Sequence, residues 1–215
     1  MGTQAEVTGM IIKTMGVGET DVRLTLFTKE RGKMFVFARG AKRPRSPLMG
    51  LTRVFTYGKF LLFEGRNSFR LAGGEAANYF EDLHRDMENT CYGSYFLELT
   101  DYYTREFLAD PPLLTLLYYA LRALTRPALP KDLVRRIFEL KCMMLNGEYD
   151  PRPAFQNETA AYTWEYIAAA RPEELFRFVI EEEALGELGK VLDAMIKKYI
   201  DRSFHSLEIL KSMGG

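Results

Sequence analysis

Alternating apolar and polar positions mark short strands in the first third of the chain. The segment Val22–Leu26 places three apolar residues on one side and two polar residues on the other, which is the period of a half-buried strand. Residues 34–38 repeat this two-residue period, and further apolar runs cover residues 6–15, 54–63 and 69–77. Five short antiparallel strands within about 75 residues favour a small closed barrel, such as an OB-fold, over a sandwich of about seven strands.

From Tyr79 onward the apolar residues recur with the period of about 3.6 residues that is typical of helices. One stripe runs from Leu83 to Tyr102, and Asp110–Pro111 supplies an N-cap residue and a proline at the first helical position. Helical patterns also cover residues 132–145 and 185–200, and Arg171–Pro172–Glu173 is expected to start a short helix. Strands followed by helices indicate an α+β protein, with a five-stranded OB-fold domain at residues 1–79 and an all-α helical domain at residues 80–215.

The zero net charge of the 215-residue chain is the sum of two oppositely charged parts. Residues 1–80 carry 13 basic and 6 acidic residues, a net charge of +7, and the remainder carries 16 basic and 23 acidic residues, a net charge of −7. A basic barrel beside an acidic helical part points to a polyanion as the partner of the barrel.

Membrane and secretory signals are absent from the pattern. The longest apolar stretch, Leu113–Leu121, is well short of the roughly 20 residues that a membrane span needs, and residues 1–8 lack a basic segment followed by an apolar one. Cys91 and Cys142 are expected to be buried thiols in a reducing compartment. We therefore expect a cytoplasmic protein without membrane contact.

Signatures of enzymatic chemistry are nearly absent. The two histidines, His84 and His205, lie in different predicted elements, and no Gly-x-Ser-x-Gly nucleophile motif occurs. Gly16–Val17–Gly18 is not followed by the third glycine of a dinucleotide-binding loop, and neither glycine–lysine pair is followed by the hydroxyl residue of a phosphate-binding loop. We expect no catalytic residues, no metal and no cofactor.

A dense basic segment is the strongest chemical signal in the chain. Between Lys29 and Arg45 there are seven basic residues and one acid, and prolines at positions 44 and 47 keep the end of this segment from forming a helix. An extended cationic loop beside a barrel can follow the regularly spaced phosphates of a nucleic acid and release their counterions. The alternative is a solvated surface loop with no ligand.

The neighbouring strand carries two phenylalanines on one face. Phe35 and Phe37 alternate with Met34 and Val36, and one of the two faces must fill the barrel. If the phenylalanines face outward, their rings can stack on nucleobases. If they face inward, they form the core, and the pattern alone leaves both arrangements open.

Several spaced blocks resemble the bacterial RecO family of recombination mediators. They are Gly18–Asp21, Leu24–Thr28, Gly32–Lys33, Ala38–Lys42, Phe55–Gly58, Tyr95–Leu99, Arg136–Lys141 and Arg202–Leu210. The resemblance covers nearly the whole chain in the expected order. It implies an N-terminal OB-fold, a helical domain, and a protein that is not an enzyme.

The same resemblance implies a set of partners and sites. RecO proteins bind single- and double-stranded DNA, anneal complementary strands, and act with RecR to load RecA onto DNA coated by single-strand binding protein, which associates them with the nucleoid. By position, the implied DNA contacts are Arg39, Lys42, Arg43 and Arg45, flanked by Lys33 and Arg53. Arg136 and Lys141 are expected to dock the C-terminal tail of single-strand binding protein, unless they are outward-facing charges of an amphipathic helix.

One departure from the family pattern concerns zinc. Many RecO proteins carry a four-cysteine zinc module after a break like that at residues 146–153, but this chain has only two distant cysteines. Two thiols cannot complete a four-ligand site, so we expect the zinc module to be absent. The other function that the sequence allows is a protein-interaction adaptor whose barrel is a scaffold and binds little DNA.

Overall fold

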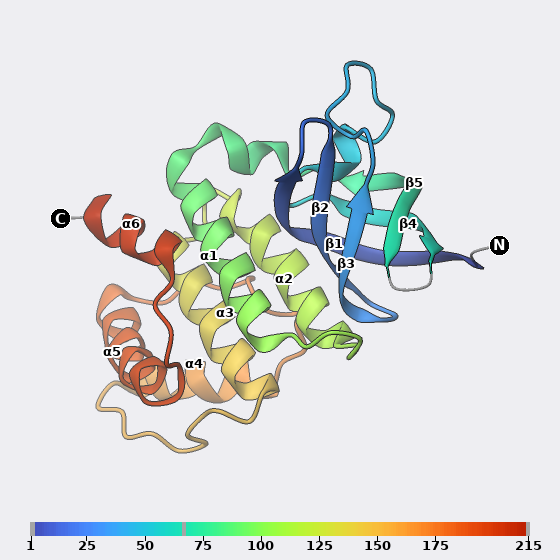
Figure 1. Ribbon diagram of the computed structural model, residues 1–215. Helices are drawn as coiled ribbons and strands as arrows, with labels where there is room; N and C mark the ends of the chain where they lie inside the picture. The colour runs from blue at the N-terminus through green and yellow to red at the C-terminus, as the bar shows by residue number, and fades with distance from the viewer. Residues whose placement is uncertain (1–2, 66–67, 214–215) are drawn as a thin grey trace. The chain divides into compact units, whose positions relative to one another are not determined.

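The computed structural model describes residues 3–65 and 68–213, which form two compact units (Figure 1). The first unit comprises residues 1–81 and 100–114, and the second comprises residues 82–99 and 115–215. The first is a closed five-stranded barrel and the second is helical, as expected for an α+β protein with an OB-like barrel. The predicted domain boundary after residue 79 stays a prediction.

Five strands close the barrel in the order β1-β2-β3-β5-β4, with β4 returning to pair with β1. Their bounds are β1 Thr3–Val17, β2 Asp21–Thr28, β3 Gly32–Ala38, β4 Tyr57–Glu64 and β5 Phe69–Asn78. The 15-residue β1 pairs with β4 through residues 3–10 and with β2 through residues 9–17, and a register shift between Ile11 and Lys13 interrupts the ladder with β2. The expectation of five antiparallel strands is wrong at one seam, since β3 and β5 pair in parallel.

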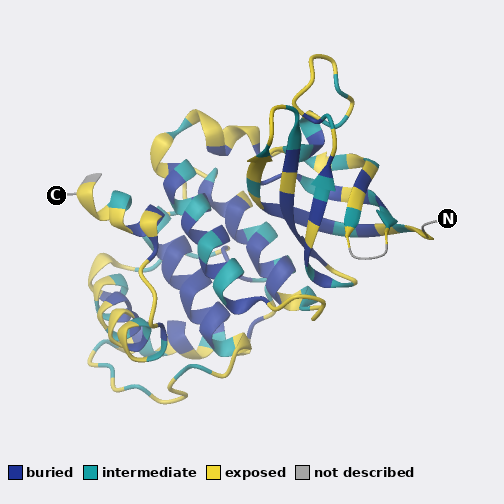
Figure 2. Ribbon diagram, viewed as in Figure 1, coloured by how far each residue is buried: buried dark blue, intermediate teal, exposed yellow. Residues whose placement is uncertain are grey.

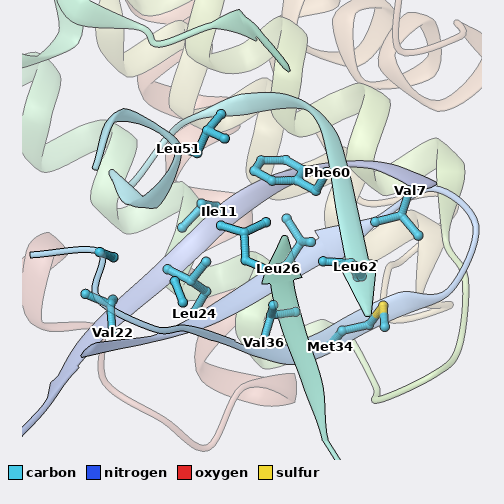
Figure 3. Packing of buried hydrophobic residues seen from close by; sticks show 13 residues of the cluster. Val7, Ile11, Val22, Leu24, Leu26, Met34, Val36, Leu51, Phe60 and Leu62 are labelled. Atoms are coloured by element: carbon cyan, nitrogen blue, oxygen red, sulfur yellow. The ribbon is translucent and has the colours of Figure 1, made fainter. Parts of the chain in front are cut away.

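The barrel interior is filled by side chains from every strand, most of them aliphatic, with Phe60 of β4 among them (Figure 3). Leu24 and Leu26 of β2 face inward together with Met34 and Val36 of β3, and none of the four is exposed. Because successive residues of a strand point to opposite faces, the side chains of Phe35 and Phe37 lie outside the barrel. This arrangement decides between the two possibilities that the sequence left open for β3.

The start of β4 differs from the sequence expectation. Strand β4 begins at Tyr57 and not at residue 54, because the chain turns at Phe55, whose φ of 70° is incompatible with a strand. A short 3₁₀ helix, η1 (Gly50–Thr52), lies between the basic loop and this turn.

Six α-helices occur within the described residues: α1 Met87–Tyr103, α2 Pro111–Leu124, α3 Lys131–Leu145, α4 Glu158–Ala169, α5 Glu182–Tyr199 and α6 His205–Met213. The stripe that begins at Leu83 is first a 3₁₀ helix, η2 (Glu81–Arg85), and α1 starts only after Asp86, whose carboxylate accepts a hydrogen bond from the Asn89 N–H group (3.1 Å). The helix predicted to start at Arg171 is wrong. That segment forms turns in which Arg171 and Glu174 pair with each other (2.7 Å).

Helix α3 occupies the interior of the helical unit, where it packs against α4 and α5 (Figure 2). Residues 133–143 are buried without exception, including four charged side chains. No helix in the described ranges is long and apolar enough to cross a membrane.

Candidate nucleic-acid interface

The loop that follows β3, residues 39–47, carries the last four of the seven cations in the predicted basic segment, and it projects from one end of the barrel (Figure 1). The other three, Lys29, Arg31 and Lys33, lie at the β2–β3 connection and the start of β3. Its base is held by main-chain contacts with the β1–β2 turn. The Gly40 N–H group donates to the Asp21 carboxylate (2.8 Å), and the Lys42 N–H group donates to the Thr20 carbonyl oxygen (2.9 Å). Gly40 adopts a φ of 64°, which lets the chain turn directly after the strand.

Asp21 links this loop to the barrel electrostatically as well. The hydrogen bond from the Gly40 N–H group lowers the pKa of the Asp21 carboxyl below its usual value, and the Thr20 hydroxyl and the nearby guanidinium groups of Arg39 and Arg43 act in the same direction. The carboxylate therefore stays ionised and orders the base of the loop at neutral pH.

The four loop cations of the prediction are all exposed (Figure 2). They are Arg39, Lys42, Arg43 and Arg45. Over the described parts of the chain, no carboxylate lies within the 4.0 Å of an ion pair from any of them. The structure thus gathers these predicted residues on one loop with their charges available to a ligand.

The two flanking cations are placed differently. The Lys33 ammonium group donates to the carboxylate and to the main-chain carbonyl of Asp101, both at 2.9 Å, and only 14% of its side chain is exposed. Arg53 is 49% exposed and lies 3.9 Å from the Glu81 carboxylate. This geometry favours a structural role for Lys33 and leaves Arg53 available as a peripheral cation.

Phe35 and Phe37 lie on the outer face of β3. The Phe35 ring is covered by the Arg23 guanidinium group, 5.4 Å from its centroid. Phe37 lines an open groove of about 860 Å³ together with Arg39, Phe63, Phe69 and Arg70. The groove thus brings the predicted residues Arg39 and Phe37 to the same surface as Phe63, Phe69 and Arg70, which were not predicted.

Sequence reasoning missed three outer-face residues, Arg23, Phe63 and Arg70. The signal that identifies two of them was available, because Phe63 follows the inward Leu62 and Arg70 precedes the inward Leu71 in the same two-residue alternation. Phe63 and Arg70 face each other across the antiparallel β4–β5 pair, but the position of Phe37 beside Arg70 had no local signal, since it depends on the parallel seam between β3 and β5.

Arg136 and Lys141 of α3 are not outward-facing charges. Arg136 pairs with Glu139 (3.1 Å) and with Asp193 of α5 (2.7 Å), which raises the pKa of its guanidinium further above the usual value although burial opposes this. Lys141 donates to the main-chain carbonyls of Ile167 and Ala168 at the end of α4, and burial lowers its pKa. Both side chains already bind within the helical unit, and their role in docking a partner stays a prediction.

Metal-ligating side chains are not gathered anywhere in the described ranges: no three His, Cys, Asp or Glu residues are placed to hold an ion. Cys91 and Cys142 are both buried thiols.

Two family models match the chain and account for most of it. The model described as recombination protein O N terminal matches residues 1–80, which contain the barrel and the basic loop, and the model described as recombination protein O C terminal matches residues 84–152. This chain belongs to the RecO family. Its membership confirms the expectation of a DNA repair and recombination protein that is not an enzyme, because RecO proteins are non-enzymatic recombination mediators.

Individual relatives support the assignment along the whole length. The DNA repair protein RecO of Acetivibrio thermocellus is 24% identical over 97% of this chain and 96% of its own length, and that of Alkaliphilus metalliredigens is 27% identical over 95% and 98%. The RecO of Shouchella clausii is 36% identical over a shorter match, 64% of this chain and 54% of the relative. Membership in the RecO family implies DNA and recombination proteins as partners.

Proposed function

We propose that this protein binds single- and double-stranded DNA through its barrel, anneals complementary strands, and helps RecR load RecA onto DNA coated by single-strand binding protein. The observation that carries the proposal is the loop of exposed cations, Arg39 to Arg45, on the barrel of a RecO family member. Work on DNA implies a cytoplasmic location at the nucleoid.

Annealing follows from charge neutralisation. Two DNA strands repel each other through their phosphates, and cations that displace condensed counterions lower this repulsion while gaining entropy from counterion release. Contacts to phosphates carry no sequence information, so a protein of this kind can pair any two complementary strands. The acidic helical part, with its net charge of −7, is repelled by DNA and is therefore directed toward protein partners.

Annealing is tested directly with complementary oligonucleotides that carry a fluorophore and a quencher. We expect the protein to accelerate quenching at low salt and to lose this effect as salt is raised. Absence of any acceleration, in a protein that binds both strands, would remove annealing from the proposal. Loading is tested by adding RecR, RecA and DNA coated with single-strand binding protein, and then repeating the assay without this chain.

A second candidate function is a protein-interaction adaptor. It is favoured by an apolar groove of about 390 Å³ in the helical unit, lined by Tyr162 and Tyr166 of α4 and by residues 177–180. Tyr162 and Val179 are largely exposed there. Binding to RecR or to the C-terminal tail of single-strand binding protein, combined with no binding to DNA at low salt, would favour the adaptor over the mediator.

A further inference from the structure

One rung of residues crosses four strands on the outer face of the barrel and alternates between guanidinium and phenyl groups. Arg23 of β2 pairs with Phe37 of β3, Phe37 pairs with Arg70 of β5, and Arg70 pairs with Phe63 of β4. Residues that pair directly across neighbouring strands point to the same face of a sheet. The adjacent inward positions, among them Leu24 and Val36, fill the core, so the whole rung faces outward.

Three of the four rung residues line the groove, and two of them are in contact. The Arg70 guanidinium group lies 5.3 Å from the centroid of the Phe63 ring, within the range of a cation–π contact. Phe37, Phe63 and Arg70 all line the groove, and both phenyl rings are half-buried. Neighbouring strands are about 4.8 Å apart, so Phe37 and Phe63 stand roughly 10 Å apart with Arg70 between them.

The guanidinium groups and phenyl rings of the groove suit an anionic chain that carries flat rings. Two carboxylates also line it, but each is already engaged: Asp21 accepts from the Gly40 N–H group, and Glu64 pairs with Arg31 (3.3 Å). Arg39 and Arg70 have no such carboxylate partner in the part of the chain that the structure describes. The groove therefore offers aromatic faces together with the guanidinium groups of Arg39 and Arg70, neither of which is held in an ion pair within the described residues.

We propose that this rung binds unpaired nucleobases, with Phe37, Phe63 and Arg70 as the residues that make the protein prefer single-stranded over duplex DNA. The inference rests on the proposed function and assigns DNA binding to two separate surfaces of the barrel. The basic loop binds phosphates, which both forms of DNA expose, whereas the rung stacks on base faces, which only a single strand exposes. Guanidinium planes and phenyl rings both serve as stacking surfaces for bases.

The decisive variant is Arg70→Lys, because it keeps the charge and removes the planar stacking surface. Arg70 is exposed, so the substitution leaves the fold intact. Phe37→Leu and Phe63→Leu keep an apolar side chain at each ring position. Arg152→Lys, at an exposed arginine of the helical part, is the matched control. Fluorescence anisotropy then measures binding to a short single strand and to a duplex of equal length at several salt concentrations.

We expect each rung variant to lose affinity for the single strand by about 5- to 140-fold, which is one stacked base at about 1–3 kcal/mol. The slope of log K against log salt should stay unchanged, since no phosphate contact is removed, and binding to the duplex should be unaffected. The control should behave as the unmodified protein.

Two outcomes contradict the inference in different ways. If the unmodified protein binds DNA but Arg70→Lys leaves single-strand binding unchanged, or weakens single-strand and duplex binding equally, the rung does not read single strands while the proposed function stands. If the unmodified protein binds neither form at low salt, the proposed function and this inference both fail.

Discussion

Replacing Lys42, Arg43 and Arg45 together by alanine should flatten the salt dependence of DNA binding. The substitutions remove three exposed charges that form no ion pair in the described parts of the chain. They should not disturb the loop, because its anchors are main-chain hydrogen bonds, such as that from the Arg43 N–H group to the Gly40 carbonyl oxygen (3.1 Å). Arg45 already has a left-handed φ of 61°, and alanine meets a similar cost there.

The size of the effect follows from counting phosphates. If each side chain neutralises one phosphate, the slope of log K against log salt becomes shallower by about 0.7 per residue on single strands, or about 2 for the triple variant. Between about 50 and 200 mM salt, the unmodified protein should then lose about 18-fold more affinity than the variant.

The measurement is a titration of a labelled oligonucleotide at several salt concentrations. A matched control replaces three exposed cations of the helical part, Arg152, Lys190 and Lys197, by alanine and so removes the same total charge. We expect the control to keep the slope of the unmodified protein. An unchanged slope in the loop variant, or an equal change in the control, would refute the assignment of the loop to phosphate binding.

Three further predictions concern residues whose partners the structure identifies. Lys33→Ala should lower the free energy of unfolding by about 2 kcal/mol, because the Asp101 carboxylate loses its partner; chemical denaturation measures this. The same variant should leave the slope of log K for DNA binding against log salt unchanged, which the DNA titration checks. Asp21→Ala should lower the melting temperature at pH 7. The hydrogen bond from the Gly40 N–H group lowers the pKa of the Asp21 carboxyl in the folded protein. The stabilisation by this carboxylate is therefore present above the unfolded pKa of about 3.9 and is lost as pH falls through the folded pKa. The difference in melting temperature between variant and unmodified protein should shrink in melts at about pH 3. Glu139→Leu should cost about 3–5 kcal/mol of stability, because it removes the one fully buried carboxylate that Arg135 and Arg136 share and leaves these buried arginines only the more exposed Asp132 and Asp193. DNA binding in the folded variant should stay normal.

The strands were predictable because their signal is local. Alternation predicted the strands at residues 22–26 and 34–38, and apolar runs predicted the other three. Alternation could not decide which face of β3 points inward, since both faces are apolar. The answer comes from the other strands: the barrel interior takes Met34 and Val36 beside Leu24, and the phenylalanines are left outside. The parallel pairing of β3 with β5 joins segments that are distant in the chain, so no local pattern contains it.

The helix predicted at Arg171 shows the limit of terminal signals. Arg171–Pro172–Glu173 has a proline in a favourable first position, but the chain leaves the helical conformation soon afterwards, and Phe176 has a φ of 62°. Leu175 and Phe176 are buried at a bend there, so a start signal alone does not make a helix.

The candidate nucleic-acid interface was likewise predictable only where its residues are neighbours in the sequence. The basic loop is contiguous, so the sequence indicates it directly. Lys33 has the same charge as its neighbours, but its partner Asp101 lies 68 positions away, and Arg136 finds Asp193 57 positions away. Charge and spacing cannot distinguish a cation that awaits a ligand from one that is already paired. Only the structure shows which cations are already paired with a carboxylate.

The central claim, that the barrel is the DNA-binding part of the chain, is tested most directly by photo-crosslinking. A single-stranded oligonucleotide with photoreactive bases is irradiated in complex with the intact protein, and the crosslinked peptides are identified by mass spectrometry. We predict crosslinks to β3, to the loop of residues 39–47 and to the strands that carry Phe63 and Arg70. Crosslinks confined to residues 115–213 of the helical unit would contradict the account.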